Sequence, residues 1–147
     1  MDGIHVANEM VALAMRARPT KDRMFLVSDA MPTVGGPDQF DLYGRDVRLS
    51  DGRLVNSEGS LAGAHVTLAE SVFRLANEIG IDKAETLRAA ISVPARLIGR
   101  EDCAKVMGAQ AYDLIRMDNE LNINGFLGDL KQKKKLHFFS APKALPL

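Results

Sequence analysis

The chain has 147 residues, 46% of them hydrophobic and 26% charged, and its 19 basic and 19 acidic side chains give a formal net charge of zero at pH 7. This length suits one ordinary domain, and the neutral balance argues against electrostatic binding to nucleic acid or to acidic lipid. No apolar stretch approaches the roughly 20 residues that cross a bilayer, and the opening stretch, MDGIHVANEM, lacks the features of a signal peptide. A single cysteine, Cys103, excludes an intrachain disulfide and fits a reducing compartment, so we expect a cytoplasmic protein.

A helix followed by a buried strand is predicted for the first 28 residues. NEMVALAMRAR (8–18) has apolar residues at helical spacing, with Asn8 as its cap and Pro19 as its stop. MFLVS (24–28) is a continuous apolar run, typical of a strand that is covered on both faces in a parallel sheet. A helix and such a strand form half of a βαβ unit, so we expect the α/β class. The chain offers few partner strands of equal quality, which indicates either a binding partner or a larger structure.

Further along the chain, the turn and capping signals are clear. Residues 40–56 predict a β-hairpin, because Asp51-Gly52 separates two apolar runs and suits a type I′ turn. Thr67 and Glu70 have capping-box spacing at the start of an amphipathic helix. The remaining predicted elements are a helix from Asp82, a short helical turn in PARLIG (94–99) and a strand at 112–118, followed by a tail without clear periodicity.

Two side chains are candidates for chemistry by their position alone. Asp29 directly follows the predicted strand, and active sites of parallel sheets form beyond the carboxyl ends of the strands. An aspartate ahead of Met31-Pro32 also suits a turn, so a purely structural role stays open. His5 lies in a turn-like stretch, DGIHV, where it either binds a ligand or metal or is an ordinary polar surface residue.

A third candidate is the small-residue stretch SLAGAHVT (60–67) before the capped helix. Small residues let a ligand approach backbone amides at the positive end of a helix, although an ordinary helix lead-in is the simpler explanation from the residues alone. The glycines at 35–36 and 108 lack phosphate-loop spacing, and the chain has no HExxH, paired-cysteine or Gly-x-Ser-x-Gly motif.

One family shares these stretches in the same order and spacing. The chain resembles the C-terminal part of the N-acetylglucosamine-6-phosphate deacetylases, of the amidohydrolase superfamily, over about residues 2–99. The stretches that carry the resemblance are DGIHV, FLVSDAMPTVGG, LYGRDVRLSDGRLVNSEGSLAG, TLAESVFRL and SVPARLIG. The resemblance implies a C-terminal fragment of a metal-dependent (β/α)8 TIM barrel plus part of a small β-sandwich domain. Its implied parts are the last part of the barrel at 1–99 (with a hairpin insertion at about 40–56), C-terminal strands of the small domain at 100–128, and an irregular basic tail at 129–147.

The resemblance also implies roles for particular residues. Asp29 corresponds to the catalytic aspartate, which takes a proton from a metal-bound water and then gives a proton to the departing amine. The implied substrate-binding residues are His5, with Asp2, Gly3 and Ile4 in the same loop, and the backbone of Leu61, Ala62 and Gly63. The implied reaction is hydrolysis of the acetamide of N-acetylglucosamine 6-phosphate to glucosamine 6-phosphate and acetate.

Other features of the chain depart from the family. The family's metal ligands, one glutamate and two histidines for zinc or iron, lie upstream of every residue matched here, so we expect no metal ligand on this chain and no activity from it alone. The implied partners are an amino-sugar phosphate and either a second copy or the missing N-terminal part. A degenerate, non-catalytic relative that acts as an interaction partner is the alternative. His65 has no explanation, and the lysine cluster of the tail (Lys131, Lys133, Lys134 and Lys135) is a weak sign of nucleic-acid binding.

Overall fold

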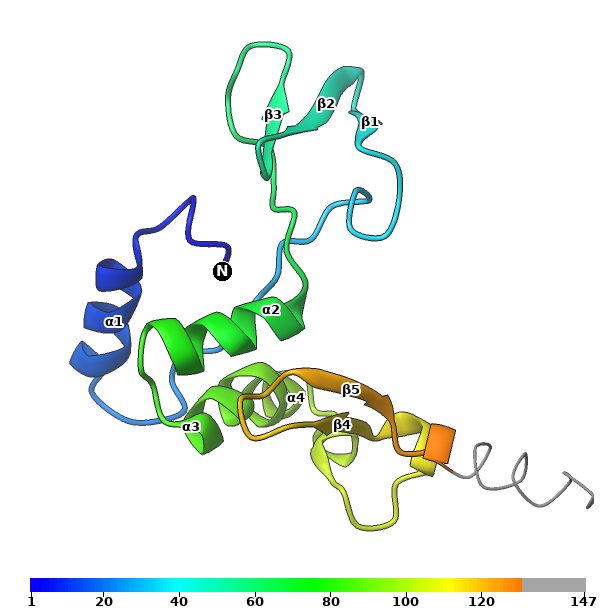
Figure 1. Cartoon of the computed structure of the whole chain (residues 1–147). Coiled ribbons are helices and arrows are strands. Elements are labelled where there is room, and N and C mark those ends of the chain that lie inside the picture. Colours follow the sequence, from blue (N-terminus) through cyan, green and yellow to red (C-terminus); the bar gives the residue numbers. More distant parts are fainter. Residues whose placement is uncertain (131–147) are drawn as a thin grey trace, which may run out of the picture. The chain divides into compact units, whose positions relative to one another are not determined.

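The computed structural model describes residues 1–130, and the chain divides into two compact units, Met1–Ala104 and a second that begins at Lys105 (Figure 1). The predicted basic tail at 129–147, with its lysine cluster, lies outside the described residues except for 129 and 130. The described residues form a mixed α and β structure, and their strands form two small antiparallel sheets that close no barrel. No helix in this part of the chain is long and apolar enough to span a membrane.

The first helix, α1 (Asn8–Ala17), forms where the apolar spacing predicts it. The predicted cap is wrong: Ala7 is the N-cap residue, no side chain caps the helix, and Asn8 is its first helical residue. The Asn8 side chain instead donates from Nδ2 to Glu78 Oε2 at 3.4 Å. The Asn8 side chain, which the local pattern predicts as the helix cap, therefore contacts Glu78, 70 residues away in the sequence.

Residues 24–28 form no regular strand in the described part of the chain, so that prediction is wrong. Burial alternates along the segment: Met24 and Leu26 pack on the core, whereas Phe25 is 44% and Val27 61% exposed. The core residues that they cover are Met15, Leu75, Ile79 and Ile81. An apolar run becomes a strand covered on both faces only when neighbouring strands and a second apolar layer are present, and the described residues supply neither.

A three-stranded antiparallel sheet follows, in the order β1-β2-β3. Its strands are β1 (Gln39–Leu42), β2 (Arg45–Ser50) and β3 (Arg53–Asn56). The turn between β2 and β3 lies at Asp51 and Gly52, whose φ angles of +50° and +74° are those of a type I′ turn. Val47 and Leu54 are each 1% exposed and form the buried face.

Two helical stretches complete the first unit. The first joins α2 (Leu68–Phe73) to a π-helical turn, η1 (Arg74–Glu78), and the second joins α3 (Lys83–Leu87), the π-helical turn η2 (Arg88–Ser92) and α4 (Val93–Leu97), before a short 3-10 helix, η3 (Glu101–Ala104). The predicted capping box is present: Thr67 accepts from the Glu70 amide, and the Glu70 carboxylate accepts from the Thr67 amide. The predicted turn around Pro94 is instead continuous with the preceding helix, since η2 widens the helix just before the residue that lacks an amide.

The second unit contains a two-stranded antiparallel hairpin. A 3-10 turn, η4 (Ala111–Asp113), precedes β4 (Ile115–Met117), which pairs with β5 (Ile123–Phe126). The strand predicted at 112–118 is therefore shorter than expected. Asp118 and Asn122 close the connecting turn through a backbone hydrogen bond of 3.0 Å.

Candidate functional site

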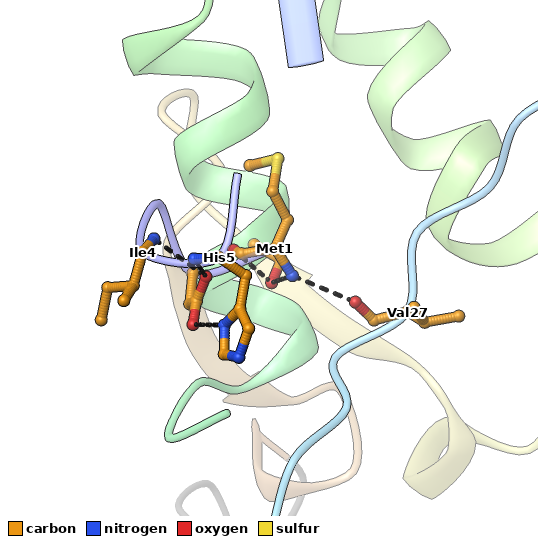
Figure 2. Close-up of polar contacts among 6 residues, drawn as sticks. Met1, Ile4, His5 and Val27 are labelled. Atoms are coloured by element: carbon orange, nitrogen blue, oxygen red, sulfur yellow. Dashed lines mark hydrogen bonds and ion pairs between the residues drawn. The ribbon is translucent and has the colours of Figure 1, made fainter. Parts of the chain in front are cut away.

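The loop formed by residues 1–5 is organised around the Asp2 carboxylate. Asp2 Oδ1 accepts from the amides of Ile4 and His5, at 3.0 and 3.2 Å, and Asp2 Oδ2 lies 2.7 Å from His5 Nδ1. Gly3 has a φ of +75°, and a Cβ atom there would lie 2.7 Å from Arg74 Nη1, so only glycine fits this turn without strain. The loop thus holds the His5 ring by one of its two nitrogens (Figure 2).

The electrostatics of this loop favour a charged Asp2. Partial burial raises the pKa of the carboxyl, but the hydrogen bonds from Ile4 and from the His5 imidazole and amide outweigh it and bring the pKa down to about 2. Hydrogen bonds donated to a carboxylate stabilise its ionised form. At neutral pH, Asp2 is therefore a fixed negative charge that orients His5.

The amine of Met1 joins this loop to two other segments. It donates to the Val27 carbonyl at 3.1 Å and to Ser71 Oγ at 3.3 Å, and Ser71 Oγ donates to the Met1 carbonyl at 3.0 Å (Figure 2). Burial lowers the pKa of the Met1 amine. The Ser71 side chain, on α2, is fully buried. The loop of residues 1–5 is thereby held against both 24–28 and α2.

Asp29 directly follows the 24–28 segment and is exposed, with a φ of +52°. Left-handed backbone is uncommon outside glycine, although aspartate tolerates it better than most residues. The Asp29 carbonyl accepts from the Ala64 amide at 3.0 Å, and the Met31 amide donates to the Ala64 carbonyl at 3.1 Å. This short parallel bridge fixes Asp29 beside the segment that precedes α2.

Asp2, His5 and Asp29 line one cavity of about 370 Å³. The remaining walls are mostly apolar and come from Met1, Val6, α1 and the 24–28 segment, with Ala64 and Ala89. The structure therefore brings together three of the residues predicted for the site, from two separate stretches of chain. Gly3 and Ile4 belong to the same loop but do not line the cavity.

Leu61, Ala62 and Gly63 adjoin this cavity through Ala64 without lining it. Leu61 pairs with Val55, and the Ala62 amide donates to the Leu54 carbonyl at 3.0 Å, so that amide is already used. Gly63 has a φ of +77°, and a Cβ atom there would lie 2.4 Å from the Met31 side chain. The small residues of this stretch thus serve the close packing of two connecting segments.

The described residues do not fit a metal. They contain no group of three or more histidine, cysteine, aspartate or glutamate side chains placed to hold an ion. A catalytic zinc site usually has three protein ligands, drawn from histidine, cysteine, aspartate and glutamate side chains. The described residues therefore supply no metal site of their own.

A contact between His65 and Thr33 was not predicted. His65 Nδ1 lies 3.0 Å from Thr33 Oγ1, and the Thr33 side chain is almost fully buried. The pKa of Glu70 is lowered mainly by the hydrogen bonds from the Thr67 amide and hydroxyl, with a smaller contribution from the neighbouring His65. The two residues lie 32 positions apart on the segments that the Ala64 bridge joins, and no short-range pattern indicates such a pair.

No protein-family model matches the chain. It is 28% identical over 105 residues to an N-acetylglucosamine-6-phosphate deacetylase of Haemophilus influenzae, which covers 69% of this chain and 27% of that protein. It is 31% identical over 99 residues to an N-acetylgalactosamine-6-phosphate deacetylase of Escherichia coli O157:H7, which covers 67% of this chain and 26% of that protein. The chain spans between 26% and 58% of the length of four such curated relatives.

The chain is also similar to solved structures of N-acetylglucosamine-6-phosphate deacetylases. The N-acetylglucosamine-6-phosphate deacetylase of Pasteurella multocida matches with a TM-score of 0.75 and 33% identity, over 85% of this chain and 33% of that one. The corresponding protein of Thermotoga maritima matches with a TM-score of 0.73 at 22% identity, over 86% of this chain and 36% of that one, which shows the fold alone. These matches confirm the resemblance stated from the sequence.

Proposed function

Because the chain is a relative of the amino-sugar-6-phosphate deacetylases, we propose that it supplies one part of an active site that hydrolyses the acetamide of N-acetylglucosamine 6-phosphate. The products are glucosamine 6-phosphate and acetate. The observation that carries the proposal is that Asp29, at the end of the 24–28 segment, lines the same cavity as the Asp2–His5 pair. In fold terms, residues 1–99 would be the last part of the barrel and 100–128 part of a small β domain.

Asp29 is the proton carrier in this proposal. Its side chain is exposed at the cavity, and the hydrogen bond between its carbonyl and the Ala64 amide fixes the backbone from which the carboxylate projects. Amide hydrolysis needs a base for the attacking water and an acid for the departing amine, and one carboxylate can serve as both in turn. A free carboxylate is a weak base toward ordinary water, so the rate depends on groups that activate the water.

His5 contacts the sugar or its phosphate in this proposal. Its Nδ1 is bonded to Asp2, which leaves Nε2 as the atom available to a hydroxyl or a phosphate oxygen. The backbone of Leu61, Ala62 and Gly63 is the second substrate contact that the resemblance implies. The Ala62 amide is bonded to Leu54, so among these residues Gly63 is the better candidate for an amide donor.

The rest of the site would come from outside the described residues. The zinc or iron that the resemblance implies would be held by ligands elsewhere, since the described residues contain no suitable group. The same reasoning predicts that the isolated chain does not hydrolyse the substrate. A second copy as partner, which the resemblance also implies, stays a prediction.

A chimera tests the proposal directly. In the Pasteurella multocida deacetylase, the segment that matches this chain is replaced by the matching residues of this chain, and acetate release from N-acetylglucosamine 6-phosphate is measured. We expect activity from the chimera, a loss of roughly 10²–10⁴-fold in kcat for Asp29→Asn, and little change for Asp38→Asn, which alters another exposed aspartate of the same unit. A folded chimera without activity, or equal effects of the two substitutions, would contradict the proposal and favour a non-catalytic relative.

A further inference from the structure

Three contacts join the segment that begins at Asp29 to the segment that precedes α2. Two are backbone hydrogen bonds: the Ala64 amide donates to the Asp29 carbonyl at 3.0 Å, and the Met31 amide donates to the Ala64 carbonyl at 3.1 Å. The third is the approach of His65 Nδ1 to Thr33 Oγ1 at 3.0 Å. Asp29, Met31 and Thr33 are alternate residues, so the side-chain contact continues the short parallel bridge by one step.

The backbone part of this connection ends at Met31. Residues 32–36 form a turn, in which the Gly36 amide donates to the Thr33 carbonyl at 3.4 Å. Backbone groups that are paired within a turn are not available to a neighbouring segment. Beyond Met31, the link between the two segments is therefore the contact of Thr33 with His65.

Burial makes the Thr33 hydroxyl depend on its partner. Thr33 is 2% exposed, so its hydroxyl has almost no access to water. A buried hydroxyl that loses its hydrogen-bond partner destabilises the structure, because its desolvation is then uncompensated. His65 is half-buried and lies two residues before Thr67, the N-cap of α2. The Thr33 side chain is thus held by a residue next to the start of a capped helix.

Asp29 depends on this connection because the fold holds it through its backbone. Its side chain is exposed, and its φ of +52° lies in the left-handed region that is uncommon outside glycine. Loss of the contact at Thr33 would let the segment move away from Ala64 and displace the carboxylate. In enzymes, a displacement of about 1 Å can lower the rate about 10²-fold.

We propose that His65, through its hydrogen bond with Thr33, is a positioning residue that holds the backbone of Asp29. The proposal rests on the proposed function, in which Asp29 is the proton carrier, and it gives His65 a role that the resemblance does not imply. His65 does not line the cavity of Asp29, so it acts through the bridge at Ala64 and not on the substrate.

Amide hydrogen exchange of the chain, measured by NMR, tests whether the pair holds the bridge. Thr33→Val keeps the shape of the side chain and removes the hydroxyl, so we expect the amides of Met31 and Ala64 to exchange at least about tenfold faster than in the wild type. Thr33→Ser, which keeps the hydroxyl, should bring both rates back to within about threefold of the wild type. The Leu49 amide, which donates to the Asp38 carbonyl in the same unit, is the internal reference and should not change.

The matched control is Thr86→Val. Thr86 is 0% exposed and lies in the same unit, but its hydroxyl has no hydrogen-bond partner within residues 1–130, so valine removes no hydrogen bond there. The two bridge amides should exchange in this variant as in the wild type. If circular dichroism shows that Thr33→Val does not fold, His65→Phe, which removes Nδ1 and keeps a ring, replaces it with the same expected effect. Equal effects of the variant and its control, or acceleration of the Leu49 amide equal to that of the bridge amides, would overturn the proposal.

The chimera with the Pasteurella multocida deacetylase gives the catalytic readout. Thr33→Val should lower kcat at least about tenfold and leave KM within about threefold, because Asp29 acts in the transition state whereas the sugar contact at His5 is retained. Thr33→Ser should keep kcat within about threefold of the parent chimera, and Thr86→Val should leave both constants unchanged.

The outcomes separate this proposal from the proposed function. An active chimera whose kcat does not respond to Thr33→Val would overturn the positioning role and leave the proposed function standing. A folded but inactive chimera would overturn the proposed function, and the exchange rates of the bridge amides would still decide whether His65 and Thr33 hold the Asp29 backbone.

Discussion

At the scale of single residues, the Asp2–His5 pair decides how the loop of residues 1–5 depends on pH. The folded-state pKa of Asp2 is about 2, below the reference value of 3.8 for an unperturbed carboxyl. Ionised Asp2 therefore stabilises the fold above about pH 4, and this contribution is lost as the pH falls through 2. Because the loop is open to solvent on one side, screening reduces the contribution to about 1 kcal/mol.

Asp2→Asn should therefore lower the free energy of unfolding by about 1 kcal/mol at pH 7. Urea unfolding of the wild-type chain and the variant at several values between pH 7 and pH 2 measures the difference. The difference should shrink as the pH falls from about 4 to about 2, because the wild-type carboxylate is then protonated. A difference that stays constant over this range would show that Asp2 acts only through its shape.

At the scale of secondary-structure elements, the capping box of α2 is the clearest local determinant. Thr67 Oγ1 accepts from the Glu70 amide at 3.1 Å, and the Glu70 carboxylate accepts from the Thr67 amide at 2.7 Å. Thr67→Ala removes the first bond and should cost about 0.5–2 kcal/mol of stability. Chemical denaturation monitored by circular dichroism measures this, with Thr20→Ala at an exposed position as the matched control. Equal stabilities of the two variants would contradict the role of the cap.

Some of these secondary-structure elements could be predicted from the sequence and others could not. The Asp51-Gly52 turn and the Thr67–Glu70 box were predictable because each depends on residues within four positions of one another. The 24–28 segment was not, because a strand depends on neighbours that an apolar run does not identify. For the site, the sequence predicts Asp29 as a candidate because it directly follows the apolar run. The structure places Asp29 and His5 on the same cavity.

Long-range contacts account for the predictions that failed or were not made. Asn8 does not cap α1, because its side chain reaches Glu78. His65 pairs with Thr33 only because the backbone bridge at Ala64 brings their two segments together. The residues of the first pair are 70 positions apart and those of the second are 32 apart. Contacts over such separations produce no periodic pattern in the sequence.

At the scale of the whole molecule, the chain is incomplete as a catalyst in our account. The cavity holds a candidate proton carrier and a candidate sugar contact, Asp29 and His5, on an otherwise largely apolar wall. It lacks, in the described residues, any group that could hold the metal implied by the resemblance. In this account, catalysis therefore requires a second part of the active site in addition to the described residues.

The most direct test measures metal content and turnover together on the purified chain. The chain is incubated with Zn²⁺ or Fe²⁺ and N-acetylglucosamine 6-phosphate, and both the metal retained after gel filtration and the acetate released are quantified. We predict far less than one equivalent of retained metal and no acetate release above the protein-free background. Stoichiometric metal together with deacetylation that Asp29→Asn abolishes would contradict the account, because this chain would then carry the whole active site.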